Sequence, residues 1–318
     1  MVMSLRMDQA VELLRAAGEP TRLRILALLR REELAVLELC RVLEQSQPRV
    51  SRHLKLLAEA GLVERFPDGA WVFYRLGAAG EVLARVASDD PVLLRDAERL
   101  QAVRAERASE AGAYFARNAA LWDEIRSLYV SETDVEAAIL DAAGPGPFKR
   151  LVDLGTGAGR MLTLLAPKAE ASVGLDLSQQ MLNIARTRVA GEGLDRCELR
   201  HGDIFGTRLP DESADLVVVH QVLHYLGDPA AAVREAGRLV APGGRLLIVD
   251  FAPHKLEFLR EQHQHRRLGF PEAEMERWLR DAGLSRIKAA ALPPADDAGL
   301  TVKIWTAERG RQPQRSAA

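Results

Sequence analysis

The sequence predicts two domains joined by a helical connector: a small, mainly helical domain ending in a β-hairpin, then an α/β domain with a parallel sheet. At 318 residues the chain is too long for one typical hydrophobic core. Apolar residues follow helical spacing through residues 8–60, whereas short apolar runs alternate with helical segments beyond residue 148. Between them, the stretch Gly144-Pro145-Gly146-Pro147 interrupts the helical pattern, because proline and glycine do not continue a helix. We therefore expect a first domain, a connector with this linker, an α/β domain and a disordered tail at residues 1–106, 107–147, 148–308 and 309–318.

The composition is that of an ordinary globular protein. Hydrophobic residues make up 47% of the chain and charged residues 28%, and the net charge of −2 argues against nucleic acid bound along the whole length. The two cysteines, Cys40 and Cys197, form no disulfide framework. The N-terminus is amphipathic rather than continuously apolar, and no stretch approaches the ~18–20 apolar residues of a membrane span. We expect a cytoplasmic protein without a membrane segment.

The N-terminal domain reads as helices followed by a hairpin. Two helices are expected on either side of Gly18-Glu19-Pro20, a third at 34–43, and a fourth from Gln47 to about Ala60 with Ser46 as its N-cap. In residues 62–76, two β-rich runs flank Pro67-Asp68-Gly69, which is typical of a hairpin turn. This order predicts a winged helix-turn-helix.

A recognition helix presents polar donors to base edges and basic groups to phosphates. In the fourth helix, Arg49 and Arg52 are one turn apart and can share a face, and Arg65 and Arg75 flank the turn of the wing. A solvated helix beside an ordinary hairpin is the alternative, which the complete helix order disfavours. The predicted DNA contacts are Ser46, Gln47, Arg49, Ser51, Arg52, Lys55, Arg65 and Arg75.

The stretch ELAVLELCRVLEQSQPRVSRHLKLLAEAGLV resembles the core of the ArsR/SmtB family of dimeric winged-helix regulators, and the likeness covers about the first third of the chain. It implies a homodimer paired through residues 5–17 and 80–106, bound to a double-stranded DNA operator. Many members sense metalloids through a Cys-x-Cys pair on the third helix. The matching positions here are Ala35 and Leu37, and residues 80–106 hold no His or Cys. With only Cys40 left we expect no metal, since one thiolate cannot build a soft-metal site.

Residues 152–159, VDLGTGAG, end a predicted strand and open a helix. Glycine lets the backbone approach a ligand closely, and a helix N-terminus favours an anionic group. A dinucleotide fingerprint would need glycine where Arg160 stands. Asp176 ends the next strand, where a carboxylate can accept both ribose hydroxyls, and Asp203 follows a third strand within reach of an adenine amino group. Open α/β sheets bind ligands beyond such strand ends.

This series resembles the class I S-adenosylmethionine-dependent methyltransferases, nearest the ubiquinone-biosynthesis type, over about residues 148–308. The resemblance implies a Rossmann-like fold and a site for S-adenosylmethionine or its product S-adenosylhomocysteine. Gly155 and Gly157 would hold the methionine part, and Asp176 the ribose. Leu177, Met181, Asp203 and Ile204 would lie near the adenine, the backbone near His220 at the amino end, and Tyr114 and Phe115 on a covering helix. The full predicted set is Asp153, Gly155, Thr156, Gly157, Gly159, Asp176, Leu177, Met181, Asp203, Ile204, His220 and Tyr114.

Methyl transfer from a sulfonium requires a positioned nucleophile, exclusion of water and sometimes removal of a proton. The candidate catalytic bases are His224, Tyr225 and His254. His263 and His265, two apart, would point to nearly opposite sides of a helix, so we expect no metal there. The His- and Arg-rich segment 254–267 could bind an anionic group, line the site, or form a surface helix touching the DNA-binding domain. Arsenic methyltransferases use several cysteines that this chain lacks.

Two functions remain compatible with the sequence. In the first, the protein is a transcriptional regulator, expected to be a repressor, whose methyltransferase-like domain binds S-adenosylmethionine or S-adenosylhomocysteine and modulates DNA binding. In the second, it is an active small-molecule methyltransferase with an autoregulatory DNA-binding domain and a small-molecule methyl acceptor. Methylation of nucleic acid itself is disfavoured, because His220-Gln221-Val222-Leu223 stands where such enzymes carry an Asn/Asp-Pro-Pro-aromatic motif.

Overall fold

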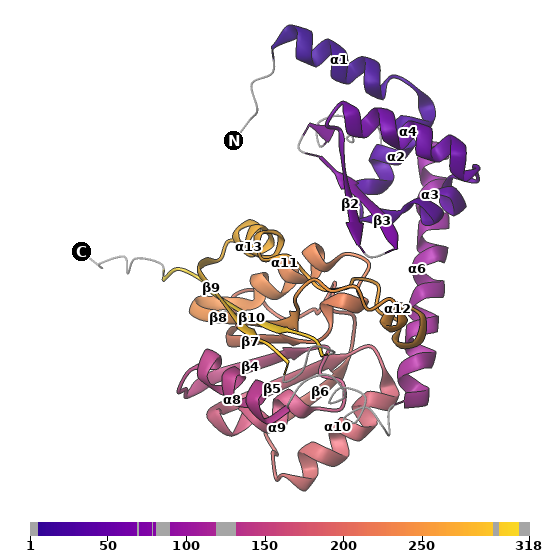
Figure 1. Ribbon diagram of the computed structural model, residues 1–318. Helices are drawn as coiled ribbons and strands as arrows, with labels where there is room; N and C mark the ends of the chain where they lie inside the picture. Colours follow the sequence, from indigo (N-terminus) through magenta and orange to yellow (C-terminus); the bar gives the residue numbers. More distant parts are fainter. Residues whose placement is uncertain are drawn as a thin grey trace. The chain divides into compact units, whose positions relative to one another are not determined.

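The computed structural model describes residues 6–68, 70–77, 79–80, 90–118, 132–294 and 299–311. The chain divides into two compact units, Met1–Glu110 and Ala111–Ala318 (Figure 1). Helix α6, Pro91–Asn118, contributes residues 91–110 to the first unit and 111–118 to the second. Residues 81–89 of the predicted dimer contacts, residues 119–131 of the predicted connector and residues 312–318 of the tail lie outside the described residues.

The first unit consists of helices around a small three-stranded sheet. The sheet order is β1-β3-β2, with antiparallel neighbours. Its elements besides α6 are α1 (Met7–Ala17), α2 (Pro20–Leu29), β1 (Leu34–Ala35), α3 (Val36–Leu43), α4 (Gln47–Glu59), β2 (Val63–Asp68) and β3 (Trp71–Leu76).

Local chemistry explains where these helices begin. The N-cap Glu19 accepts a hydrogen bond from the Arg22 backbone N–H at 3.0 Å, and Pro20 occupies the first turn of α2, where its missing N–H costs nothing. On α4, Val50, Leu54 and Leu57 are fully buried and share one face, so the opposite face is left to solvent. The break at residues 18–20 and the start of α4 at Gln47 agree with the sequence prediction.

Two local expectations were wrong. The predicted third helix begins two residues late, because Leu34 and Ala35 pair with Tyr74 and Phe73 as strand β1. The predicted turn is also displaced. The ladder of β2 and β3 continues to the pair Asp68 and Trp71, so Pro67 and Asp68 belong to strand β2 rather than to a turn; residue 69 lies outside the described residues.

Ser46 is the N-cap of α4, as predicted, in extended conformation; its side chain makes no capping hydrogen bond.

The second unit is a seven-stranded sheet with helices on both faces (Figure 1). The strand order is β6-β5-β4-β7-β8-β10-β9; neighbours from β6 to β8 are parallel, and β10 is antiparallel to both β8 and β9. Because chain order reverses between β4 and β7, the carboxyl ends of these strands flank the switch point at which such sheets bind ligands.

The bounds of its elements are α8 (Glu132–Ala143), β4 (Phe148–Leu154), α9 (Arg160–Leu165), η2 (Ala166–Lys168), β5 (Ala169–Asp176), α10 (Gln179–Gly191), β6 (Cys197–His201), β7 (Ala214–His220), η3 (Leu223–Tyr225), α11 (Pro229–Leu239), β8 (Val240–Phe251), α12 (Phe258–His263), α13 (Glu272–Asp281), β9 (Ser285–Leu292) and β10 (Val302–Glu308).

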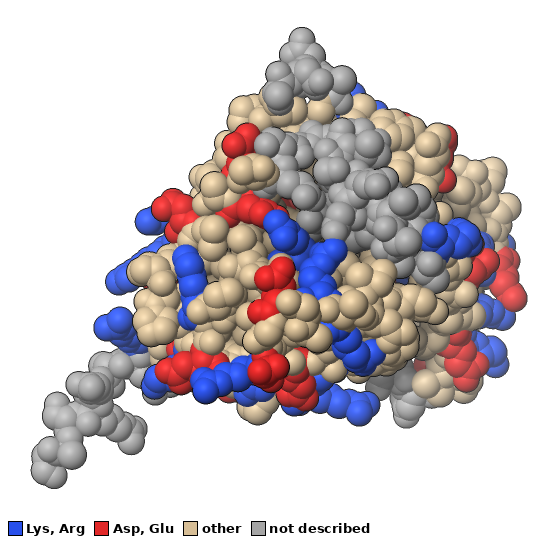
Figure 2. Space-filling view, turned by 90° about the horizontal axis from the view of Figure 1, so that it is seen from below, with Lys and Arg blue, Asp and Glu red and all other residues tan. Residues whose placement is uncertain are grey.

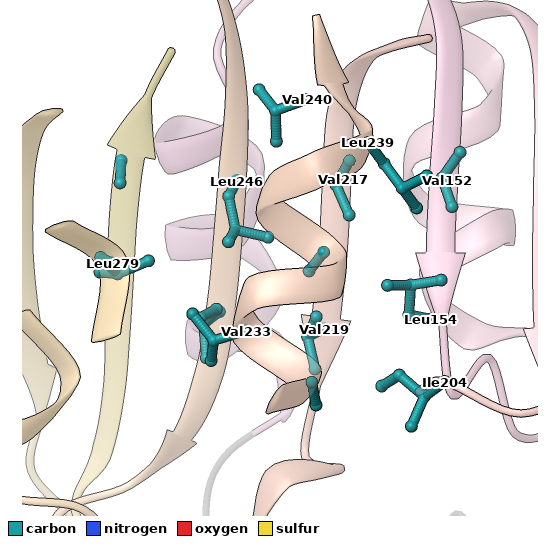
Figure 3. Packing of buried hydrophobic residues seen from close by; sticks show 14 of the residues in the cluster. Val152, Leu154, Ile204, Val217, Val219, Val233, Leu239, Val240, Leu246 and Leu279 are labelled. Carbon is teal, nitrogen blue, oxygen red and sulfur yellow. The ribbon is translucent and has the colours of Figure 1, made fainter. Parts of the chain in front are cut away.

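The sheet is buried on both faces. Along β7, Val217 and Val219 belong to one buried cluster, and Leu216 and Val218 belong to the other. Successive strand residues point to opposite faces, which explains why this strand reads as an unbroken apolar run. Figure 3 shows Val217 beside Val152 and Val219 beside Leu154 of β4, with side chains of α11 packed over them.

Acidic and basic side chains are interspersed on the face seen in Figure 2, in keeping with the small net charge of the chain. Within the described residues, no helix is both long and apolar enough to cross a membrane.

Candidate functional site

The glycine-rich loop connects β4 to α9 and is hydrogen-bonded to the carboxyl end of β5. The backbone N–H groups of Gly155 and Thr156 both donate to the Leu175 carbonyl, at 2.8 and 3.0 Å. Gly155 has φ +75°, and a Cβ there would lie 2.4 Å from Val222 Cγ2. Glycine is therefore required for this turn. Gly159 follows as the N-cap of α9.

Asp176 stabilises the same loop from the end of β5. Its Oδ2 accepts from the Gly157 N–H at 2.8 Å and its Oδ1 from the Ser178 N–H at 2.7 Å. Burial raises the pKa of this carboxyl, although both backbone donors act in the opposite direction. The carboxylate is thus oriented by the backbone, which leaves its remaining lone pairs for hydroxyl donors such as those of a ribose.

Asp153 lies at the base of the loop and is 1% exposed. Its Oδ2 accepts from the Thr156 hydroxyl at 2.6 Å, while its Oδ1 is buried without a hydrogen-bond partner. Burial, reinforced by the nearby charge of Asp176, raises the pKa of Asp153 to about 7. An acceptor oxygen of this kind fits a ligand that brings its own cationic donor, such as the ammonium group of an amino acid.

The neighbouring strand ends supply an apolar surface with hydrogen-bonding edges. Met181 and Ile204 are buried, and Leu177 is 54% exposed. The His201 ring Nε2 lies 2.9 Å from the Leu177 carbonyl, and Asp203 Oδ1 accepts from the Phe205 N–H at 3.0 Å. Together with Asp153 and Asp176, these residues present carboxylate acceptors, exposed backbone groups and an apolar surface. This combination suits a nucleoside linked to an amino acid.

The remaining two members of the predicted nucleotide set lie elsewhere around this edge. His220 ends β7, and Tyr114 is buried near the end of α6. The Tyr114 hydroxyl lies 2.7 Å from His263 Nδ1 at the end of α12, which joins the last turn of α6 to the second unit. The side chain of Phe115 lies outside the described residues.

Two of the three candidate bases, His224 and Tyr225, lie together in η3 beyond β7. His224 is 1% exposed, and its Nδ1 lies 2.8 Å from Asp250 Oδ1 at the end of β8. Its ring is 4.1 Å from Tyr225 and stacks at 4.1 Å on His265. Burial raises the pKa of the Tyr225 phenol well above its usual value, so this group stays protonated. His254 lies between β8 and α12, and its Nδ1 accepts from the Leu256 N–H at 3.3 Å.

Asp250 and His265 were missed by the sequence prediction. Asp250 ends the apolar run LLIVD, as Asp153 ends LVD and Asp176 ends VGLD, so the shared position after a strand was the available signal. The surface-helix interpretation of segment 254–267 was wrong, since Arg260, His265, Arg266 and Arg267 are buried and α12 ends at His263. Arg267 donates to Glu274 at 2.7 Å.

In the first unit, the predicted DNA contacts differ in how freely they could reach a phosphate. Gln47, Arg49, Arg52 and Lys55 are exposed on α4, as is Arg65 on β2, whereas Ser51 is half-buried. Among the ion pairs of the described residues, Arg49, Arg52 and Arg65 take part in none, and Lys55 lies 3.9 Å from Glu59.

Arg75 is held within the wing. Its Nε donates to Glu64 at 2.7 Å, its Nη1 lies 3.7 Å from Glu33, and its guanidinium lies 5.1 Å from the Phe66 ring centroid. A phosphate contact by Arg75 would have to break these interactions.

Two family models match the chain. Residues 19–65 match the bacterial regulatory protein, arsR family, and residues 152–248 match a methyltransferase domain. The chain thus carries one segment that matches the arsR family and a second segment that matches a methyltransferase domain. The helix order and wing of the first unit, and the Rossmann-like sheet of the second, agree with that combination and with the predicted fold class.

Relatives of known sequence match the methyltransferase domain in part. A demethylmenaquinone methyltransferase of Clavibacter sepedonicus is 29% identical over 150 residues, 44% of this chain and 60% of that protein. The methyltransferase YcgJ of Bacillus subtilis is 30% identical over 105 residues, 33% of this chain and 42% of that protein. The aligned segments thus span about half the length of these relatives.

Solved structures agree on the fold of this domain. A chain from the complex between the Haloferax volcanii Trm112 methyltransferase activator and a methyltransferase has a TM-score of 0.52 at 21% identity, covering 62% of this chain and 98% of its own. The [4+2]-cyclase SpnF has a TM-score of 0.53 at 17% identity, covering 63% of this chain and 95% of its own. At such identities the likeness shows the fold alone, and the second name shows that this fold also serves cyclisation.

The described residues contain no group of three or more His, Cys, Asp or Glu side chains arranged to hold a metal ion. Cys40 and Cys197 are free thiols whose pKa values are raised by burial, which disfavours the thiolate that a soft metal needs.

Proposed function

We propose that this protein is a DNA-binding transcriptional repressor whose methyltransferase domain binds S-adenosylmethionine or S-adenosylhomocysteine and thereby changes its affinity for an operator. The arsR-family region supports the DNA-binding half of this proposal. The glycine loop with Asp153 and Asp176 supports the nucleotide-binding half. The observation that carries the connection between the halves is the shared helix α6.

Ion pairs hold the first part of α6 within the first unit, which we call the DNA-binding unit in this proposal. Asp96 accepts two hydrogen bonds from the Arg24 guanidinium, both at 2.7 Å, and is almost fully buried. Glu32, beside β1, pairs with Arg104 at 3.2 Å and with Arg107 at 2.9 Å. A charged pair removed from water resists separation, so this part of the helix moves with the DNA-binding unit.

The last turns of the same helix belong to the second unit. There Tyr114 is buried and its hydroxyl is hydrogen-bonded to His263. A ligand that shifts Tyr114 would therefore act on a helix that is anchored among the DNA-binding elements. Coupling between two such sites is typically about 1–3 kcal/mol, which corresponds to about a 5- to 150-fold change in affinity.

Within the proposed nucleotide site, each group has a role that follows from its geometry. Asp153 Oδ1 would receive the ligand ammonium group, and Asp176 the ribose hydroxyls. Met181 and Ile204 would pack against the adenine, with Asp203 at its edge. Bound S-adenosylmethionine supplies an electrophilic methyl group on a sulfonium.

We further propose a homodimer, since operator half-sites require two recognition helices. Helix α1 exposes Met7, Val11 and Leu14, at 84%, 40% and 57%, and these positions share one face of the helix. An apolar stripe of this kind supports pairing through residues 5–17. Sedimentation of wild type against a Val11→Glu, Leu14→Glu variant measures it, and an unchanged dimer would contradict this part of the proposal.

The central experiment is fluorescence anisotropy of a labelled DNA fragment from upstream of the protein's own gene, at fixed salt because salt sets DNA affinity. Protein is titrated without ligand, with S-adenosylmethionine and with S-adenosylhomocysteine. We expect the dissociation constants to differ at least fivefold between two of these conditions. Identical constants, measured where calorimetry shows both nucleotides bound, would overturn the regulatory coupling.

A matched control separates the ligand site from the DNA site. The Gly155→Ala variant places a Cβ against Val222 and should lose nucleotide binding, so its DNA affinity should equal that of the ligand-free wild type in every condition. A nucleotide response that persists in this variant would assign the signal to another site.

The second candidate function, an active small-molecule methyltransferase with an autoregulatory DNA-binding domain, is favoured by one specific observation: the buried pairing of His224 with Asp250 near the proposed nucleotide site.

A further inference from the structure

Three buried side chains meet beyond the carboxyl ends of β7 and β8: His224, Asp250 and His265, which are 1%, 0% and 6% exposed. His224 Nε2, Asp250 Oδ2 and His265 Nδ1 have no hydrogen-bond partner in the described part of the chain. Most buried polar atoms in proteins are hydrogen-bonded, and each exception calls for an explanation. Three exceptions in one cluster, at the sheet edge where α/β proteins bind ligands, indicate that the polar group of a ligand completes it.

Hydrogen bonds determine which nitrogen of His224 is available. Asp250 Oδ1 accepts from the Phe251 backbone N–H at 2.9 Å and also lies 2.8 Å from His224 Nδ1. An ionised carboxylate only accepts, so Nδ1 carries the proton and Nε2 keeps its lone pair. The backbone around the ring is fixed as well, because the His224 carbonyl accepts from the N–H groups of Arg266 and Arg267 at 2.8 and 3.0 Å.

The surroundings of this lone pair are aromatic. The rings of Tyr225 and Phe251 lie 4.1 and 5.2 Å from that of His224, and the His265 ring stacks on it at an interplanar angle of 28°. Burial lowers the pKa of His265, and the neighbouring His224, His254, His263 and Arg260 add to this effect, so the ring stays neutral. A charged methyl acceptor would lose its hydration in these surroundings. A planar neutral molecule with an O–H group would instead stack on the rings and donate a hydrogen bond to His224 Nε2.

We propose that His224 is the general base for methyl transfer to a phenol or enol hydroxyl, with Asp250 as the residue that positions it. The proposal deepens the nucleotide-binding half of the proposed function and rests on it. The acceptor oxygen forms the new C–O bond, while the C–S bond of the sulfonium breaks and leaves its electron pair on sulfur. The hydroxyl proton moves to His224 Nε2, and the resulting imidazolium keeps its Nδ1–H bond to Asp250, the arrangement that orients a catalytic histidine in hydrolases.

The first test needs neither cofactor nor acceptor. Long-range proton–nitrogen NMR spectra of the full chain, with His224 assigned by comparison with the His224→Gln variant, report the tautomer of the ring. We expect a protonated Nδ1 and a bare Nε2, and we expect Asp250→Asn to reverse this, because an amide group can donate to Nδ1. A wild-type ring protonated on Nε2 would overturn the assignment as base.

The second test uses 4-nitrophenol as a chromophoric probe with S-adenosylhomocysteine present. Nε2 accepts from the neutral hydroxyl and burial disfavours the phenolate, so the visible band of the bound probe should develop about one pH unit higher than in free solution. His224→Gln should lessen this shift, whereas the same substitution at His53 in the first unit should preserve it. Absence of probe binding while calorimetry shows bound S-adenosylhomocysteine would overturn this inference, whereas absence of S-adenosylhomocysteine binding would refute the proposed function itself.

Transfer kinetics complete the test, with S-adenosylmethionine and 4-nitrophenol as substrates. His224→Gln should lower kcat by about 10²- to 10⁴-fold, with the KM for S-adenosylmethionine changed less than about threefold. Asp250→Asn should lower kcat and also displace the pH profile of kcat, which a purely structural effect would leave in place. A variant that transfers the methyl group at the wild-type rate, or a wild-type protein that binds both compounds without transfer, would overturn the proposal.

Discussion

Asp153 is the buried carboxyl at the base of the glycine-rich loop. Replacing it by asparagine tests whether its ionised form destabilises the folded protein. The carboxyl is fully buried, and burial raises its pKa from 3.8 to about 7. The folded protein therefore binds a proton that the unfolded chain has released between these two pH values, and stability falls as pH rises through that window. Asparagine has nearly the same shape, can still accept from the Thr156 hydroxyl, and carries no proton to lose.

The magnitude follows from the shift. A difference of about 3 pH units at about 1.4 kcal/mol per unit amounts to about 4 kcal/mol over the full range from pH 3.8 to 7. Between pH 5 and pH 8 about 3 kcal/mol of this should be lost, because Asp153 is still protonated at pH 5 and is mostly ionised at pH 8.

Denaturant unfolding without nucleotide measures the effect, followed by the fluorescence of the buried Trp278 and Trp305 of the same unit. From pH 5 to pH 8, the wild type should lose about 3 kcal/mol more than Asp153→Asn. The same substitution at Asp281, on the surface of α13, controls for removal of one negative charge. If wild type and Asp153→Asn lose stability equally over this interval, the assignment of a titrating, buried Asp153 is refuted.

Three further substitutions have defined outcomes. Gly155→Ala adds a Cβ only 2.4 Å from Val222 Cγ2, so calorimetry should show at least a 100-fold loss of S-adenosylhomocysteine affinity. Affinity within tenfold of wild type would contradict the loop geometry. Asp96→Ala leaves the Arg24 guanidinium without its paired acceptor, so unfolding of the first unit should cost about 3 kcal/mol less, and a change below 1 kcal/mol would mean that the pair contributes little. Arg52→Ala should weaken DNA binding and reduce the slope of log affinity against log salt by about 1, whereas an unchanged slope would remove Arg52 from the phosphate contacts.

The sequence predicted those features that depend on local pattern. Helical spacing predicted that Val50 and Leu57 of α4 face the core, because periodicity reports directly which face a helix buries. The positions of Asp153 and Asp176 at strand ends followed from the apolar runs that precede them. The carboxyl ends of parallel neighbours lie at one edge of a sheet, so the order of strands and helices along the chain was enough to predict that the glycine-rich loop and Asp176 lie at the edge where such sheets bind ligands.

Features that depend on pairing between distant segments could not be predicted in this way. Leu34 and Ala35 continue an apolar helical pattern, yet they pair with β3 as a strand. The pairing of His224 with Asp250 joins residues from two different strand ends, and the ion pair between Arg75 and Glu33 depends on how the wing packs on β1. Periodicity shows that a side chain is buried but not which other side chain it meets.

Strand β9 has a consequence for the behaviour of the protein at high concentration. It is an edge strand of the sheet, and Ala289, Ala290 and Ala291 along it are exposed, so backbone groups on its outer side can pair with an extended segment of another molecule. Arg286 and Lys288 are the charged residues of this strand, and like charges oppose the approach of a second copy. Selection on these two positions would then act against aggregation rather than for ligand or DNA binding. Apolar replacements there would be tolerated in dilute solution but would promote fibrous self-association in a crowded cell.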